Sequence, residues 1–87
     1  MEEYNYKNIV NFVAVHKTTA TNILAELISI ADTYGYVLLA DYYRMIDVKT
    51  DQLDKSYGWT SQSIYEAEVE KSGSGYAISL PAVEILN

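Results

Sequence analysis

Residues 35–80 decide the fold, and they divide into GYVLLADYYRMIDV (35–48), KTDQLDKSYGWTSQS (49–63) and IYEAEVEKSGSGYAISL (64–80). The first part opens with a glycine that can end a preceding helix, and it continues as a short amphipathic helix. The second part has no periodicity and is rich in turn-forming residues. The third part alternates apolar and charged residues before a glycine-bearing connection, which is typical of a β-hairpin.

Two helices and one strand are expected before the hairpin. Residues 20–34, ATNILAELISIADTY, carry apolar side chains at spacings of three and four, and Gly35 follows where a left-handed residue ends a helix. Residues 39–47 carry a shorter apolar stripe, and a helix of this length persists only when it docks on a core. Residues 8–15, NIVNFVAV, are dense in β-branched and aromatic residues and predict a strand buried on much of both sides.

The hairpin strands are expected at residues 64–71 and 76–80, joined by SGSG at 72–75, and residues 49–63 are expected to be an irregular loop. This order of elements predicts an α+β fold of the type β-α-α-β-β. In it, a small, mostly antiparallel three-stranded sheet is covered on one face by two helices. With 87 residues, the chain (1–87) is expected to form a single α+β domain with one modest core.

Three glutamates form the first candidate site. Alternation puts Glu66, Glu68 and Glu70 on one face of the strand, with successive residues about 7 Å apart, and puts Tyr65 and Val69 on the core face. One interpretation is an acidic stripe that engages a basic groove on another protein. The other is a solvated face whose like charges protect a sheet edge from aggregation. No metal site is expected, because one strand cannot wrap oxygen ligands around an ion.

The loop offers a second group of candidates. Asp47, Asp51 and Asp54 form an acidic cluster that is interleaved with lysines and lacks the pattern of a calcium loop, so ion pairing and helix capping explain it simply. Asp51 and Asp54, together with Tyr57, are candidates for one end of a partner-binding surface. Tyr57, Gly58 and Trp59 together form either an exposed aromatic anchor or a segment in which Gly58 makes a turn and Trp59 folds back onto the core.

The charge of the chain narrows the classes of partner. Twelve acidic residues face six basic ones, which gives a net charge of −6. Nucleic acids and anionic membranes are bound mainly through cations, so neither is an expected partner, whereas a protein with a basic surface is. A helix–helix–hairpin order also resembles a winged helix. However, Arg44 in the second helix and Lys71 in the hairpin are outnumbered by nearby carboxylates, which argues against a DNA reader.

The chain offers little for catalysis. It has no cysteine, and His16 is its only histidine, so neither a thiolate nucleophile nor a catalytic triad is indicated. We therefore expect no enzyme activity and no cofactor. The acidic start, MEEYNYKN, does not resemble a signal peptide, and no apolar run approaches the length of a membrane span, so a cytoplasmic location is expected.

Four short motifs carry a resemblance that covers a little over half of the chain. They are DTYG (32–35), ADYY (40–43), DKSYGWT (54–60) and GYAISLP (75–81). With these motifs, the chain resembles a class of small, mostly uncharacterised proteins of bacteriophages and prophages that share a Tyr-Gly-Trp loop. Its acidic hairpin departs from that class, in which we expect a more basic first hairpin strand. The resemblance implies a mobile-element origin, a bacterial host cytoplasm and an accessory role.

Together these observations predict a non-enzymatic, phage- or prophage-encoded binding protein. We expect it to inhibit a host nucleic-acid-binding defence protein by occupying a basic surface, as anti-CRISPR proteins do. The expected contacts are Glu66, Glu68, Glu70, Asp51, Asp54 and Tyr57. The alternatives are a non-catalytic assembly module that forms a homodimer or larger homo-oligomer, an immunity protein that neutralises a toxic nuclease, and a nucleic-acid binder.

Overall fold

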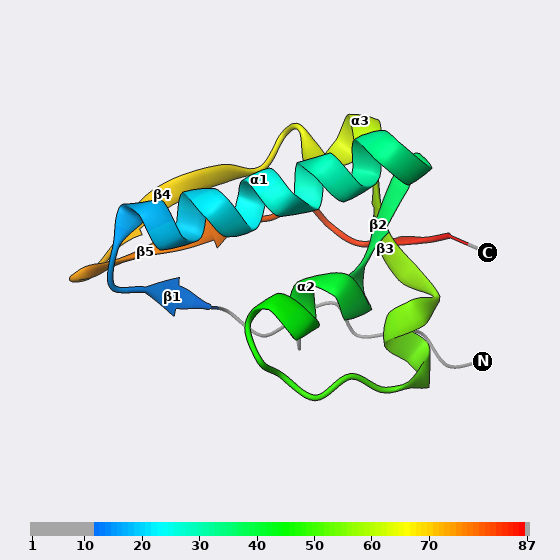
Figure 1. The fold of residues 1–87 in the computed structure, drawn as a ribbon, viewed down its shortest axis with the longest axis horizontal. Helices are drawn as coiled ribbons and strands as arrows, with labels where there is room; N and C mark the ends of the chain where they lie inside the picture. Colours follow the sequence, from blue (N-terminus) through cyan, green and yellow to red (C-terminus); the bar gives the residue numbers. More distant parts are fainter. Residues whose placement is uncertain (1–11, 87) are drawn as a thin grey trace.

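The computed structural model describes residues 12–86 and contains three α-helices, one 3₁₀ helix and six short strands within that range (Figure 1). In chain order the elements are β1 (Val13–Ala14), α1 (Lys17–Tyr34), β2 (Tyr36–Leu38), α2 (Leu39–Met45), η2 (Gln52–Lys55), β3 (Tyr57–Thr60), α3 (Ser61–Ile64), β4 (Glu68–Ser72), β5 (Gly75–Ser79) and β6 (Glu84–Ile85).

The strands form two small antiparallel sheets, which confirms the α+β class. The first sheet has the order β1-β5-β4, so the N-terminal strand joins the hairpin through β5. This is the three-stranded sheet that the sequence predicts. The second sheet has the order β2-β3-β6, and nothing in the sequence pattern predicted it. The two helices are divided between the sheets rather than covering one face together.

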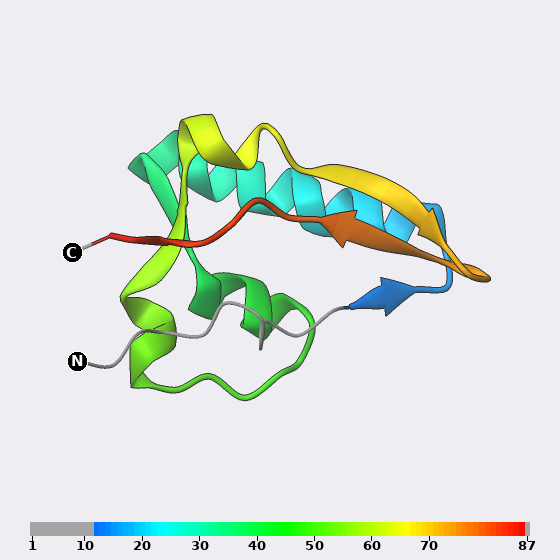
Figure 2. The ribbon, with the colours of Figure 1, turned by 180° about the vertical axis from the view of Figure 1, so that it is seen from behind.

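Helix α1 covers one face of the first sheet, and its apolar stripe explains why. Ala20, Leu27 and Ala31 are fully buried at helical spacings, as the periodicity predicts. The helix begins at Lys17, three residues before the expected start. Gly35 ends it with a φ of 87°, and the Gly35 N–H donates to the Ala31 carbonyl at 2.7 Å. In the view from behind, β4 and β5 lie in front of α1 (Figure 2).

Helix α2 packs on the second sheet, where the largest buried side chains meet. Trp59 on β3 and Tyr42 on α2 are almost completely buried, with ring centroids 6.2 Å apart and ring planes at 87°, an edge-to-face arrangement. Val37 lies opposite Trp59 in the register of β2 and β3. Burying each of these side chains stabilises the fold by about 1.5–3 kcal/mol before the entropy cost is subtracted. This contact is the docking that so short a helix requires.

Residues 49–63 are more regular than expected. They contain η2, strand β3 and the first three residues of α3, so the prediction of an irregular loop is wrong. The reason lies in tertiary contacts, because β3 is the central strand of the second sheet and pairs with both β2 and β6. Strand pairing, rather than a pattern within the segment, fixes its conformation.

The first strand of the hairpin and the N-terminal strand also differ from the predicted ones. The hairpin strand starts at Glu68 rather than at residue 64, because α3 and a turn occupy residues 61–66. Of the strand predicted at 8–15, residues 8–11 lie outside the described residues. The described part forms β1, in which Ala14 is buried and Val13 is half exposed, so β1 is covered on one side only.

Candidate protein-binding surface

Strand β4 presents two of the candidate glutamates on an uncovered sheet face. Glu68 and Glu70 lie two residues apart on one strand and are both exposed, as alternation predicts. Val69 between them packs against the core, together with Ile78, its partner on β5. Because Val69 and Ile78 point toward α1, Glu68 and Glu70 point the other way, onto the face that Figure 2 presents.

The third glutamate does not share this strand. Glu66 is exposed, but it lies in the turn that links α3 to β4, where its N–H donates to the Ser63 carbonyl at 3.0 Å. The expected row of three glutamates along one strand is therefore wrong for Glu66. Glu68 and Glu70 together form the β4 stripe, and Glu66 lies two residues before this stripe in the chain.

Tyr65 lies on the surface rather than in the core. It is 59% exposed, and its hydroxyl donates to the Asp32 carboxylate at 2.8 Å. This hydrogen bond raises the pKa of Tyr65 above its ordinary value, because the neutral phenol is the form that donates. The expected core position is wrong because residues 65 and 66 form a turn instead of continuing the strand alternation. This hydrogen bond connects the C-terminal end of α1 to the turn that precedes β4.

Asp51 and Asp54 cap the 3₁₀ helix η2. The Asp51 carboxylate accepts from the Leu53 N–H at 2.7 Å, and the Asp54 carboxylate accepts from the Asp51 N–H at 2.9 Å. Asp54 is only 5% exposed, whereas Asp51 is exposed. The local reason for this geometry is that each carboxylate satisfies a backbone donor that the start of a helix leaves unpaired. The capping interpretation of these residues therefore has direct structural support.

The Tyr57-Gly58-Trp59 segment belongs to the core sheet. Trp59 is completely buried, and its indole N–H donates to the Pro81 carbonyl at 2.7 Å, so the interpretation in which Trp59 folds back onto the core is confirmed. Tyr57 is half buried. Gly58 does not make a turn, because it lies within β3, where β2 approaches so closely that a Cβ atom would collide with the backbone of Val37.

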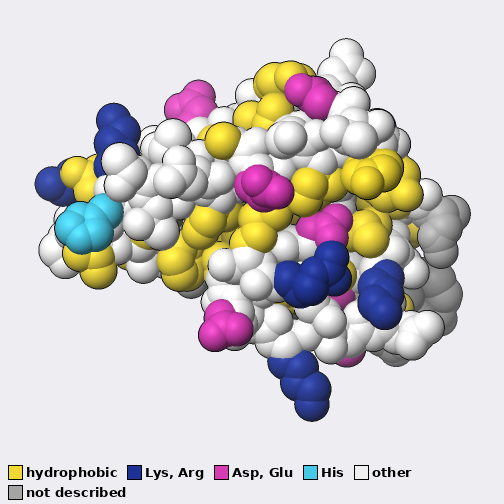
Figure 3. Space-filling model, viewed as in Figure 1, with side chains coloured by type: hydrophobic (Ala, Val, Ile, Leu, Met, Phe, Trp, Pro, Cys, Tyr) yellow, Lys and Arg dark blue, Asp and Glu magenta, His cyan; other side chains and the backbone are white. Residues whose placement is uncertain are grey.

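The six sequence-predicted contact residues do not form one surface. In both ribbon views, the η2–β3 segment with Asp51, Asp54 and Tyr57 lies at the opposite end of the long axis from β4 (Figures 1 and 2). On the side that α1 covers, acidic side chains are scattered rather than gathered into one patch, and one lies against a basic side chain (Figure 3). The β4 stripe is therefore the part of the predicted site that the fold keeps together.

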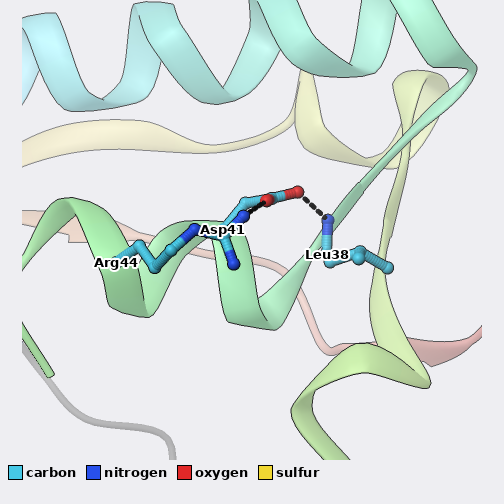
Figure 4. A network of polar contacts seen from close by, with 3 residues as sticks. All are labelled: Leu38, Asp41 and Arg44. Atoms are coloured by element: carbon cyan, nitrogen blue, oxygen red, sulfur yellow. Dashed lines mark hydrogen bonds and ion pairs between the residues drawn. The ribbon is translucent and has the colours of Figure 1, made fainter. Parts of the chain in front are cut away.

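The glutamates of the stripe have no cationic partner within residues 12–86. The one ion pair between described residues joins Asp41 to Arg44 on α2, where Asp41 also accepts from the Leu38 N–H at 3.0 Å (Figure 4). Lys71 on β4 points to the opposite sheet face, and its ammonium lies 5.9 Å from the centre of the Tyr76 ring. The negative charge of the stripe is therefore left for solvent or a partner.

Within residues 12–86, no three His, Cys, Asp or Glu side chains gather in a way that could hold a metal ion. His16 is exposed at the start of α1. Across the described range, no helix combines the length and the hydrophobicity that crossing a bilayer demands.

Comparison with known proteins gave no match to any family model, curated protein or solved structure.

Proposed function

We propose that this chain is a non-catalytic binding protein that docks onto a basic surface of another protein through the open face of the β1-β5-β4 sheet. The observation that carries the proposal is the β4 stripe, two exposed carboxylates side by side on an uncovered face with no cation beside them in the described residues. A net charge of −6 adds long-range attraction to basic partners, which raises the rate of encounter.

Charge alone is too weak to hold such a complex. An exposed ion pair contributes about 0.2–1 kcal/mol, so the glutamates supply only a fraction of the roughly 8 kcal/mol that micromolar binding requires. Apolar contact area must supply the rest. The same sheet face offers Val13 and Ala77, which lie opposite each other in the register, with Val13 half exposed. The proposed surface thus combines apolar side chains on β1 and β5 with the charged β4 stripe along one side.

We further propose that the partner is a host defence protein whose basic surface holds nucleic acid, and that the chain acts as an anti-CRISPR-type inhibitor encoded by a phage or prophage. The support is the chemistry of the surface together with the resemblance of residues 32–81 to small phage proteins. A carboxylate row that occupies a phosphate-binding groove would block substrate entry without any reaction of its own. The bacterial cytoplasm is the setting in which such a protein would work.

A plaque assay tests this function. Bacteria with active CRISPR immunity would express the wild-type chain, a stripe variant with Glu66, Glu68 and Glu70 replaced by glutamine, or a scattered variant with Glu26→Gln, Asp47→Asn and Glu84→Gln. Both variants remove three negative charges from exposed positions. We expect the wild-type and scattered chains to restore plaques and the stripe variant to lose most of this effect. Equal activity of a folded stripe variant would refute the proposed site, and no effect of the wild type across a panel of CRISPR systems would refute the inhibitor role.

The main alternative is a homo-oligomeric assembly module. The observation that favours it is the number of large apolar side chains left exposed, including Val15 and Ile85, which are 77% and 65% exposed. Light scattering separates the two functions. A tight homo-oligomer that is insensitive to salt would support assembly, whereas a monomer that forms a salt-sensitive complex with a basic protein would support the inhibitor.

A further inference from the structure

Strand β4 is the last strand of its sheet within residues 12–86, so its outer edge faces away from β5 with no described strand beside it. A sheet edge carries backbone N–H and C=O groups that can pair with another extended chain.

The hairpin geometry identifies the outward groups. The connection between β4 and β5 has two residues, and Gly73 has a φ of 61° whereas Ser74 does not have a positive φ, the pattern of a type II′ turn. In such a hairpin Ser72 and Gly75, which flank the turn, form a hydrogen-bonded pair, and every second pair along the ladder repeats this. The Glu70 and Glu68 backbones therefore face β5, and the N–H and C=O groups of Val69 and Lys71 point to the free edge.

The side chains of β4 favour some pairing strands over others. If two copies of β4 paired antiparallel through their free edges, the central registers would place Glu70 against Glu70, Glu68 against Glu70, or Lys71 against Lys71. Like charges directly opposite each other destabilise a strand pair. A strand with lysine or arginine at every second position would instead set its cations against Glu68 and Glu70, on the face that the sheet leaves open.

We propose that β4 binds an extended basic segment of its partner by strand addition, with main-chain hydrogen bonds at Val69 and Lys71 and with alternating cations over Glu68 and Glu70. This inference rests on the proposed function and specifies how the basic partner is held. Strand addition gives more affinity and specificity than isolated carboxylates can. The main-chain hydrogen bonds add affinity, and the two-residue spacing of the glutamates adds specificity.

Two peptides of identical composition test the mode of binding. One peptide of about ten residues, the length of a long strand, alternates lysine and threonine, and the other carries all of its lysines before all of its threonines. Hydrogen exchange of the full chain, followed residue by residue by NMR, reports on the edge without any mutation. We expect the alternating peptide to slow exchange at the Val69 and Lys71 amides at least tenfold and the blocked peptide to have little effect. Equal effects of the two peptides, or protection elsewhere only, would overturn strand addition.

A matched pair of variants provides an independent test. Lys71→Pro removes an outward N–H that β5 does not use, and Lys71→Ala removes the same charge but keeps the N–H. With both variants shown to be folded by circular dichroism, we expect Lys71→Pro to bind the alternating peptide at least tenfold more weakly than Lys71→Ala. Equal affinities would overturn the proposal, and so would sedimentation showing a dimer of the wild-type chain that Lys71→Pro dissociates. If Lys71→Pro does not fold, the exchange measurement on the wild type decides.

Failure of strand addition is distinguishable from failure of the proposed function. If the stripe variant loses plaque restoration while Lys71→Pro keeps it, the acidic face binds its partner by another geometry. If the stripe variant keeps plaque restoration, the face itself is not the site.

Discussion

Gly58 has no room for a side chain, because a Cβ atom there would collide with the Val37 carbonyl and lie 2.9 Å from the Leu38 Cα atom. Both obstacles are backbone atoms of β2, so neither can rotate away. We expect Gly58→Ala to lower the free energy of unfolding by about 3 kcal/mol. Gly35→Ala is the control, since its Cβ would meet nothing within 4 Å and only the left-handed conformation would cost about 1 kcal/mol. Urea unfolding of the two variants measures the difference, and similar costs would contradict the packing of β2 on β3.

Tyr42 makes stability depend on alkaline pH. Burial raises its pKa, the nearby Tyr43 raises it further, and a hydrogen bond to the Phe12 backbone acts in the opposite direction. The folded pKa thus exceeds the value of about 10 in the unfolded chain, so the unfolded state loses its proton first as pH rises. The stabilisation is complete below pH 10 or so and is lost as pH rises through the folded pKa.

The expected result is a fall in the free energy of unfolding as pH rises above about 10, with a shallower fall in Tyr42→Phe. Tyr65, whose pKa is also raised, acts in the same direction, so the Tyr42 variant reduces the pH dependence without abolishing it. Tyr36→Phe serves as the control because Tyr36 is 44% exposed. An unchanged slope in Tyr42→Phe would show that the burial of this phenol does not govern the alkaline transition.

At the scale of elements, η2 depends on the capping carboxylates at its start. Asp54 is almost fully buried and accepts from the Asp51 N–H, so Asp54→Ala should lower the free energy of unfolding by about 1–2 kcal/mol. Glu70→Ala, at an exposed position, should change it by less than about 0.5 kcal/mol. Thermal melts of the two variants test this. Equal stability of Asp54→Ala and the wild type would mean that the capping bond contributes nothing.

Helices α1 and α2 were predictable from the sequence because each buries an apolar stripe of its own, whereas α3 and η2 were not predicted. Leu27 and Ala31 recur at helical spacing, and Gly35 marks the end of α1 with a left-handed conformation. The second sheet was not predictable, because β2, β3 and β6 are two to four residues long, too short for alternation to show. Their pairing is set by contacts between segments distant in sequence, such as Gly58 with Glu84.

The alternation of apolar and charged side chains predicted that the strand starts at residue 64, whereas β4 starts at Glu68. Residues 64–71 alternate apolar and charged side chains, but Ile64 and Ala67, three residues apart, are both buried, which is a helical spacing. Thr60 accepts from the Ser63 N–H at 3.1 Å and so caps the single turn of α3. The capping residue and the i, i+3 pair were the signals that would have moved Glu66 out of the strand.

At the scale of the whole molecule, the sequence predicted the sign and the exposure of the candidate surface but not its extent. Glu68 and Glu70 were predictable because a two-residue period fixes which face of a strand they occupy. Asp51 and Asp54 were grouped with them only because they are acidic, and the fold places η2 at the far end of the long axis (Figure 1). Proximity between segments depends on chain topology, which residue patterns do not specify.

We propose that the position of the negative charge on β4, rather than the total charge of the chain, determines binding. To test this, we would measure the affinity of the wild-type, stripe and scattered chains for a purified CRISPR nuclease identified as a target by the plaque assay, at low and at physiological salt. We expect the stripe variant to bind at least about tenfold more weakly and to lose most of the salt dependence, whereas the affinity of the scattered variant stays close to that of the wild type. Equal weakening of the two variants would contradict it, because total charge would then explain the binding.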